Sequence, residues 1–76
     1  MITEKVGQRI KQLRNEQELS QEKLALKAEL DRTYLAGAEL GKRNISLKSL
    51  EKIVNALNVS FEDFFKGRRI SASFCG

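Results

Sequence analysis

The stretch from Gln21 to Lys42, QEKLALKAELDRTYLAGAELGK, decides the fold of this 76-residue chain. Its apolar residues recur at helical spacing on both sides of a short break that runs from Glu29 to Asp31. The small side chain of Ala25 allows two helices to approach each other closely. The pattern therefore predicts one helix over residues 21–28 and a second over residues 32–40, joined by a tight turn.

Four helix starts share one local signal, in which an apolar residue precedes a capping Ser or Asp and a second apolar residue follows four positions after the cap. The four caps are Ser20, Asp31, Ser46 and Ser60. They predict further helices over residues 47–57 and 61–66, and a first helix over residues 4–16 precedes them all. Because the chain has no proline and no strand-like alternation, we expect an all-α, compact five-helix domain.

The expected core is the set of apolar residues on the inner faces of these helices. It comprises Val6, Ile10, Leu13, Leu24, Ala25, Ala28, Leu35, Leu47, Leu50, Ile53, Val54, Leu57, Phe61, Phe64 and Phe65. The three phenylalanines at helical spacing are expected in the core or in a dimer contact. Gly41 and Gly67 stand where left-handed helix caps are needed.

The composition narrows the possible functions. With no histidine and one cysteine, the chain lacks the commonest general base and the usual zinc ligands. We therefore expect no enzyme, no metal and no cofactor, and we expect Cys75 to be an incidental reduced thiol. No apolar run approaches the roughly 20 residues that span a bilayer, so a cytoplasmic protein without a membrane segment is expected. The net charge of +4 favours an acidic partner.

Two helices joined by a tight turn form a helix-turn-helix, whose second helix enters the DNA major groove. Over residues 6–65 the chain resembles the Cro and phage-repressor class of DNA-binding domains, on its Ser20-Gln21 helix opening, Ala25, and Glu39-x-Gly41. Within that class, LDRTYLAG and KRNISLKSL most resemble the controller proteins of restriction-modification systems. The resemblance implies a lambda-repressor-like domain over residues 1–67, while residues 68–76 are expected to form a flexible tail.

Base-contacting residues are expected at the start and on the face of the second helix: Arg32, Thr33, Tyr34 and Gly37. A guanidinium bonds guanine with two parallel hydrogen bonds, and a threonine meets a base edge or a thymine methyl group. Gly37 would leave the groove-facing surface free of a side chain, and the resemblance adds Arg43. The alternatives are a solvated charge for Arg32, a packing residue for Tyr34 and relaxed selection for Gly37.

Phosphate contacts are expected around these residues, since free N–H groups at helix starts attract anions. The candidates are Arg14, Ser20, Gln21, Lys42, Asn44, Ser46 and Ser49; for Arg14, Asn44 and Ser49 the expectation comes from the resemblance. The resemblance also implies that Arg14 and Glu39 form an ion pair that orients the second helix.

We expect a homodimer on a pseudo-palindromic operator, because one such domain contacts only a few base pairs. The dimer contact is expected at Leu57, Asn58, Val59, Phe61 and Phe65. A controller protein would bind double-stranded DNA near its own promoter, activating at low dose and repressing at high dose. Activation would make RNA polymerase a further partner.

Two alternatives remain open. The chain could be a phage-type or developmental repressor, or a helix-turn-helix module for protein contact, such as an antitoxin. The Arg, Thr and Tyr residues at the contact positions favour DNA over a protein partner. The sequence also departs from the family where Glu18 and Glu29 replace turn glycines, where Ala38 replaces a larger residue, and where Leu40 is expected to be exposed.

Overall fold

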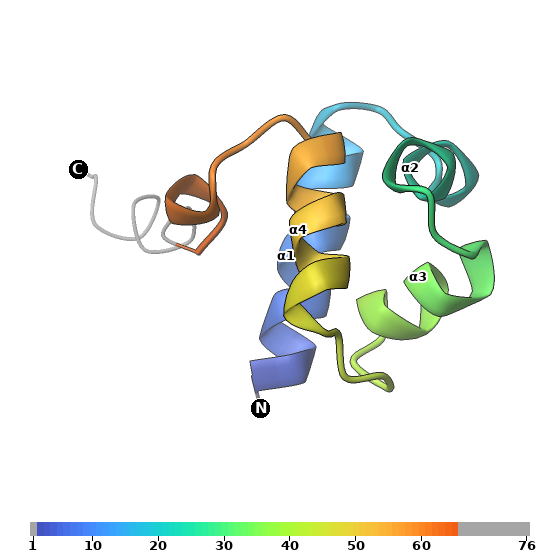
Figure 1. Ribbon diagram of the computed structural model, residues 1–76, viewed down its shortest axis with the longest axis vertical. Coiled ribbons are helices and arrows are strands. Elements are labelled where there is room, and N and C mark those ends of the chain that lie inside the picture. Colours follow the sequence, from blue (N-terminus) through green and yellow to red (C-terminus); the bar gives the residue numbers. More distant parts are fainter. Residues whose placement is uncertain (1, 66–76) are drawn as a thin grey trace.

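The computed structural model describes residues 2–65, which form helices joined by turns and loops, with no strand in that range (Figure 1). The helices are α1 (Ile2–Glu16), α2 (Gln21–Ala28), α3 (Arg32–Glu39) and α4 (Leu47–Ala56). A fifth helical segment covers residues 61–65. In Figure 1, α2 and α3 lie on one side of α1 and α4, and residues 61–65 lie on the other. The predicted all-α, five-helix architecture is confirmed, while Gly67, Cys75 and the predicted tail lie outside the described residues.

The predicted capping side chains begin the helices as expected. Ser20 Oγ accepts a hydrogen bond from the Lys23 amide, and Ser46 Oγ accepts one from the Ser49 amide. Ser60 Oγ accepts from the Asp63 amide at 3.0 Å. Asp31 caps α3 by accepting from the Thr33 and Tyr34 amides. Each cap partners a backbone donor that has no acceptor within its own helix.

The ends of the four labelled helices also share one arrangement. In each, a left-handed residue follows the helix and the next amide bonds back to a carbonyl five residues earlier, as in a Schellman motif. The left-handed residues are Glu18, Glu29, Gly41 and Asn58, with φ of 57°, 59°, 77° and 62°. The corresponding bonds are Leu19 to Arg14, Leu30 to Ala25, Lys42 to Gly37 and Val59 to Val54. Short connections therefore reverse the chain sharply after each of these four helices.

The core forms where α1 packs on α3 and where α2 packs on both α3 and α4. Its fully buried large side chains are Ile10, Leu24, Leu35, Ile53, Val54, Leu57 and Phe64. Ala38 is also completely buried, and Leu40 is exposed as expected. Most of the predicted core is thereby confirmed.

Three residues predicted for the core are exposed instead. Leu47 is 81% exposed because it occupies the first position of α4, where no neighbouring element covers it. Phe61 and Phe65 are 41% and 53% exposed, since Phe64 alone among the three phenylalanines turns inward. Leu57 was predicted both for the core and for the dimer contact; it is completely buried in the core, so its side chain is not on the surface.

Helix α1 binds the rest of the domain through side chains that the sequence did not single out. Arg9 donates from Nε to the Phe64 carbonyl at 2.7 Å and from its guanidinium to the Asp63 carbonyl at 3.0 Å. Gln17 donates from Nε2 to the Leu57 carbonyl. These bonds attach α1 to the end of α4 and to the helical segment that follows it.

Candidate nucleic-acid interface

The start of α3 presents the residues expected to contact bases. Arg32 and Thr33 are exposed in its first turn, and Tyr34 is half-buried beside them. The carboxylate of Asp31 accepts from the Thr33 and Tyr34 amides at 3.0 and 3.3 Å. The cap fixes the backbone of this turn while the side chains of Arg32 and Thr33 remain accessible.

Arg43 joins this group from the loop after α3. The left-handed Gly41 reverses the chain, and the Lys42 amide bonds back to the Gly37 carbonyl at 3.0 Å. Arg43 consequently lies against α3, with its guanidinium carbon 5.6 Å from the centre of the Tyr34 ring. An arginine over an aromatic face is held by a cation–π attraction. The structure thus brings three of the five base-contact candidates, Tyr34, Gly37 and Arg43, into one cluster.

The opposite face of α3 carries a buried ion pair. Arg14 Nε donates to Glu39 Oε2 at 2.7 Å, and a second guanidinium nitrogen donates to Glu39 Oε1 at 3.1 Å. The third donates to the Leu19 carbonyl at 2.8 Å. Gln21 Nε2 also donates to Glu39 Oε1, at 3.1 Å. One carboxylate therefore links α1, α2 and α3 and holds the two helices of the helix-turn-helix.

This network changes the expectation for Arg14. The Arg14 side chain is only 11% exposed and that of Glu39 only 2%. Each guanidinium nitrogen of Arg14 already has a protein partner. The ion pair is present, and its burial leaves little of the Arg14 charge on the surface.

The other phosphate candidates lie at helix starts or in the α3–α4 loop. Ser20, Lys42, Asn44 and Ser46 are exposed, and Gln21 and Ser49 are half-buried. Ser46 Oγ also donates to Ser49 Oγ at 3.1 Å. Several of these residues lie at the starts of α2 and α4, where the first amides have no acceptor within their own helix.

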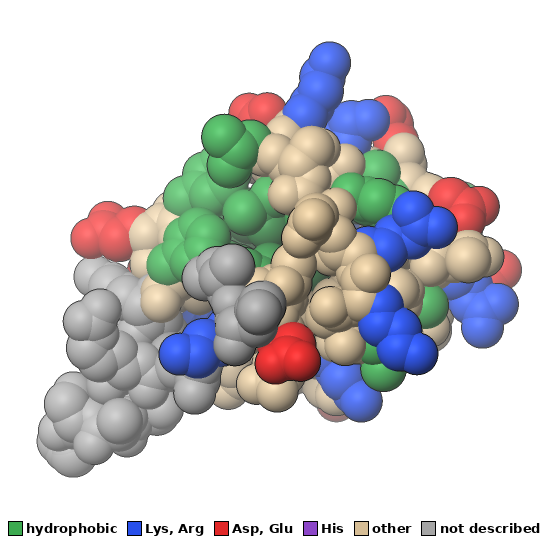
Figure 2. Space-filling view, turned by 90° about the horizontal axis from the view of Figure 1, so that it is seen from below, with side chains coloured by type: hydrophobic (Ala, Val, Ile, Leu, Met, Phe, Trp, Pro, Cys, Tyr) green, Lys and Arg blue, Asp and Glu red, His purple; other side chains and the backbone are tan. Residues whose placement is uncertain are grey.

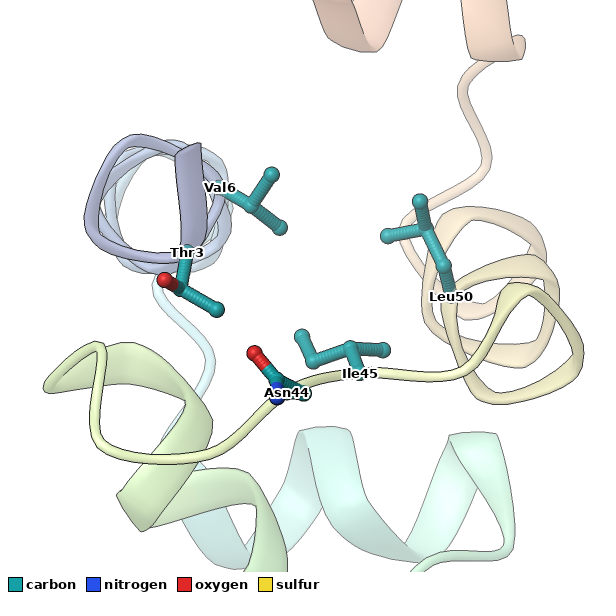
Figure 3. Close-up of a pocket in the computed structure, with 5 residues that line it drawn as sticks. All are labelled: Thr3, Val6, Asn44, Ile45 and Leu50. Carbon is teal, nitrogen blue, oxygen red and sulfur yellow. The ribbon is translucent and has the colours of Figure 1, made fainter. Parts of the chain in front are cut away.

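A hollow of about 300 Å³ opens beside this loop (Figure 3). Val6 of α1 and Leu50 of α4 point into it from opposite sides, and Asn44 and Ile45 of the loop close it, with Thr3 next to them. The lining is mainly apolar and includes no charged side chain. The loop that carries Asn44 therefore rests over apolar groups of α1 and α4.

Figure 2 shows the surface of the molecule from below, with several Lys and Arg side chains on one side and a group of hydrophobic side chains on the other.

Among residues 2–65, no helix is both long and apolar enough to cross a membrane. The same part of the chain contains no cluster of three or more His, Cys, Asp or Glu residues that would hold a metal ion.

Gly7 also positions α3, although no sequence motif singled it out. It is buried in the middle of α1, and a Cβ atom there would overlap the backbone carbonyl oxygens of Ala38 and Glu39. Only glycine lets α1 approach α3 this closely. A glycine inside a predicted helix was the available signal, because it costs about 1 kcal/mol relative to alanine unless packing requires it.

Comparison with known proteins identifies the family. The family model for the helix-turn-helix matches residues 10–64, which is most of the chain. The chain belongs to the helix-turn-helix family. Within it, the chain is 47% identical over 60 residues to the control protein C.MunI of a Mycoplasma species, covering 78% of this chain and 81% of that protein. It is 50% identical over 54 residues to the immunity repressor of Bacillus phage phi105, covering 71% of this chain and 38% of the repressor.

Solved structures place this helix-turn-helix chain among the restriction-modification controller proteins. The controller protein C.AhdI of Aeromonas hydrophila superposes with a TM-score of 0.80 at 43% identity, over 83% of this chain and 96% of that one. The controller protein C.Esp1396I, solved as a tetramer with its natural 35-base-pair operator, gives a TM-score of 0.83 at 45% identity. That match covers 87% of both chains. The expected resemblance to controller proteins is confirmed.

Proposed function

We propose that this helix-turn-helix protein is a sequence-specific transcriptional regulator of the controller type, which acts in the cytoplasm as a homodimer on a pseudo-palindromic DNA operator. The observation that carries this proposal is the outer face of α3. Arg32 and Thr33 are exposed at its first turn, and the Arg43 guanidinium lies over Tyr34 beside them. A cationic helix start of this kind suits the major groove, where base edges offer distinct acceptors.

Each group has a definite role in this proposal. Arg32 forms two parallel hydrogen bonds to a guanine, and Thr33 meets a base edge or a thymine methyl group. Tyr34 contacts a pyrimidine–purine step or a phosphate through its ring and hydroxyl, and Arg43 contacts a second base. The buried Glu39 keeps α3 at the angle these contacts require, through Arg14.

Phosphate contacts fix the protein on the duplex without sequence information. We assign them to side chains and free amides at the starts of α2 and α4 and in the loop between α3 and α4. These residues are Ser20, Gln21, Lys42, Asn44, Ser46 and Ser49. Two observations support this assignment. The side chains are exposed, or half-buried for Gln21 and Ser49, and helix N-termini attract anions.

The dimer contact is proposed at the end of the described chain, on the side away from α2 and α3 in Figure 1. Phe61 and Phe65 are exposed there, Asn58 is exposed and Val59 is half-buried. A chain this small covers its apolar surface poorly alone, so pairing two copies would bury these rings. Residues 1–67 would form this DNA-binding and dimerisation domain, with 68–76 as its tail.

As a controller protein, it would bind near its own promoter and regulate its own gene and an adjacent endonuclease gene, with RNA polymerase as a partner in activation. The match to the phage phi105 repressor favours a second candidate, a phage-type repressor. A neighbouring gene for a methyltransferase or an endonuclease would distinguish the two.

The test is selection of bound DNA from a random pool, with the wild type, Arg32→Ala and Lys52→Ala. Lys52 is an exposed cation of α4 outside the proposed site and serves as the matched control. We expect a symmetric motif with two half-sites for the wild type and for Lys52→Ala. Arg32→Ala should lose preference for one base in each half-site by about 5- to 150-fold, the value of one bidentate arginine–guanine pair. Selection of no motif by the wild type would contradict the proposal and favour a protein-contact module.

A further inference from the structure

Gly37 has no conformational reason to be glycine. It lies inside α3, and Gly41 is the glycine with a positive φ among residues 2–65. Inside a helix, alanine is favoured over glycine, because glycine loses more backbone freedom on folding. A requirement for space is therefore the remaining physical reason within the folded chain.

The space beside Gly37 is filled by the side chain of Arg43. A Cβ atom built at position 37 would lie 3.2 Å from Arg43 Cγ, 3.4 Å from Cδ and 3.4 Å from Nε. The first of these distances is too short for an unstrained carbon–carbon contact, since such atoms prefer about 3.5–4.0 Å. The aliphatic part of Arg43 therefore lies directly on the bare backbone of α3.

The far end of the same side chain lies over Tyr34, with its guanidinium carbon 5.6 Å from the ring centre. Tyr34 and Gly37 are three residues apart and so share one face of α3. Arg43 thus follows this face from Gly37 toward the start of the helix, where Arg32 and Thr33 are exposed.

We propose that Gly37 is a positioning residue: by lacking a side chain, it forms a slot that directs Arg43 along α3 onto Tyr34 and toward the DNA bases. This inference rests on the proposed function for its effect on DNA, although its geometry is testable without DNA. Arginine is long and flexible, and ordering it before binding reduces the freedom it loses on the DNA. The Schellman end of α3 supplies the approach, because the Lys42 amide bonds to the carbonyl of Gly37 itself.

The test uses the full chain with Gly37→Ala, Arg43→Ala and the double variant. Gly37→Ala is expected to fold, because the group that must move is a flexible side chain and not a backbone. A thermal melt should show an unchanged or raised midpoint. Should Gly37→Ala fail to fold, the Arg43→Lys variant probes the same slot, since lysine has a stem of similar length but no planar guanidinium.

The first measurement is made without DNA. Protons above an aromatic ring resonate upfield, and the Tyr34→Leu variant separates the effect of the one tyrosine from that of the four phenylalanines. The Arg43 side-chain protons should therefore be shifted upfield in the wild type. In Arg43→Lys, the methylene protons of the lysine should be shifted upfield in the same way. The shift should be lost in Tyr34→Leu and in Gly37→Ala. Unchanged Arg43 resonances in Gly37→Ala would overturn the proposal.

The second measurement is the affinity for the DNA motif selected by the wild type. Arg43→Ala should weaken binding by about 5- to 150-fold if it loses one base contact. Gly37→Ala should produce a large part of that loss, and the double variant should bind no more weakly than Arg43→Ala. If the losses of affinity in the two single variants are equal and add up in the double variant, the proposal is overturned, because the added methyl group would then obstruct the DNA directly. If the wild type selects no DNA, the proposed function fails, whereas the resonances of Arg43 still decide the slot.

Discussion

The inner and outer faces of α3 differ in how deeply their contact groups are buried. On the inner face, Ala38 and Glu39 lie against the backbone at Gly7, and Glu39 is bonded by Arg14. On the outer face, exposed side chains project from the first turn, and one loop arginine lies across the helix. Buried backbone and ion-pair contacts therefore set the position of α3, while the exposed side chains of its outer face remain available to a ligand. Changes on the inner face should lower stability and DNA affinity together, and changes on the outer face should alter DNA affinity without lowering stability.

The largest expected effect is that of Glu39→Ala. It leaves the nearly buried Arg14 without its carboxylate partner, and breaking such a pair costs about 3–5 kcal/mol. Urea unfolding should show this loss, and operator affinity should fall because α3 is no longer oriented. Glu22→Ala is the matched control, since Glu22 is an exposed acid of α2.

Equal operator affinity of the Glu39→Ala and Glu22→Ala variants would contradict this expectation, because the inner face would then have no influence on DNA binding. The Glu39→Gln variant tests the same expectation with a smaller change. The amide keeps the shape and one acceptor oxygen, so its losses should lie between those of the wild type and Glu39→Ala.

Gly7→Ala is expected to have the next largest effect. The added methyl group would overlap two carbonyl oxygens of the α3 backbone, which have no flexible side chain to move aside. Overpacking of this kind costs about 1–3 kcal/mol, which for a domain of this size lowers the melting temperature by several degrees. Thermal unfolding monitored by circular dichroism measures it.

The matched control for Gly7→Ala is the same substitution at Gly37, on the outer face. There the methyl group meets only the Arg43 side chain, so the melting temperature should hold or rise. A similar fall in both variants would show that glycine is needed at the two positions for one common reason, against the contrast drawn between the faces.

The smallest expected effect concerns the turn that leads into α3. Glu29 holds a left-handed conformation with φ of 59°, which costs a non-glycine residue about 1–2 kcal/mol. Glu29→Gly should therefore raise the unfolding midpoint without changing DNA affinity, since it touches neither face of α3. Asn58→Gly should gain less, because asparagine tolerates this conformation better than glutamate. No gain at Glu29, or a decrease, would mean that the strain is relieved elsewhere.

The sequence predicted those parts of the fold that depend on local signals. Ser20, Asp31, Ser46 and Ser60 cap the helices as expected, because a cap and its amide lie within three residues of each other. The left-handed turns at Glu18 and Glu29 followed from the family pattern. Asn58 was missed, although asparagine is the usual substitute for glycine in that conformation.

Features that depend on distant parts of the chain were not predictable in this way. Helical periodicity placed Leu47 on the core side of α4 but could not show that the packed layer ends before it. The bonds of Arg9 join residues 54 and 55 positions apart, and no local pattern announces them. The contact of Arg43 with Tyr34 and Gly37 likewise depends on how the α3–α4 loop folds back.

The bonds of Arg9 also have a consequence for the synthesis of the protein on the ribosome. Helix α1 is made first, yet its carbonyl partners at Asp63 and Phe64 are made 54 and 55 residues later. At about 5–20 residues per second, this delay is roughly 3–11 s. During that interval Arg9 has no carbonyl partner at Asp63 or Phe64, so the bonds that attach α1 to the segment after α4 form later than the contacts of α1 with α3, whose residues are synthesised earlier.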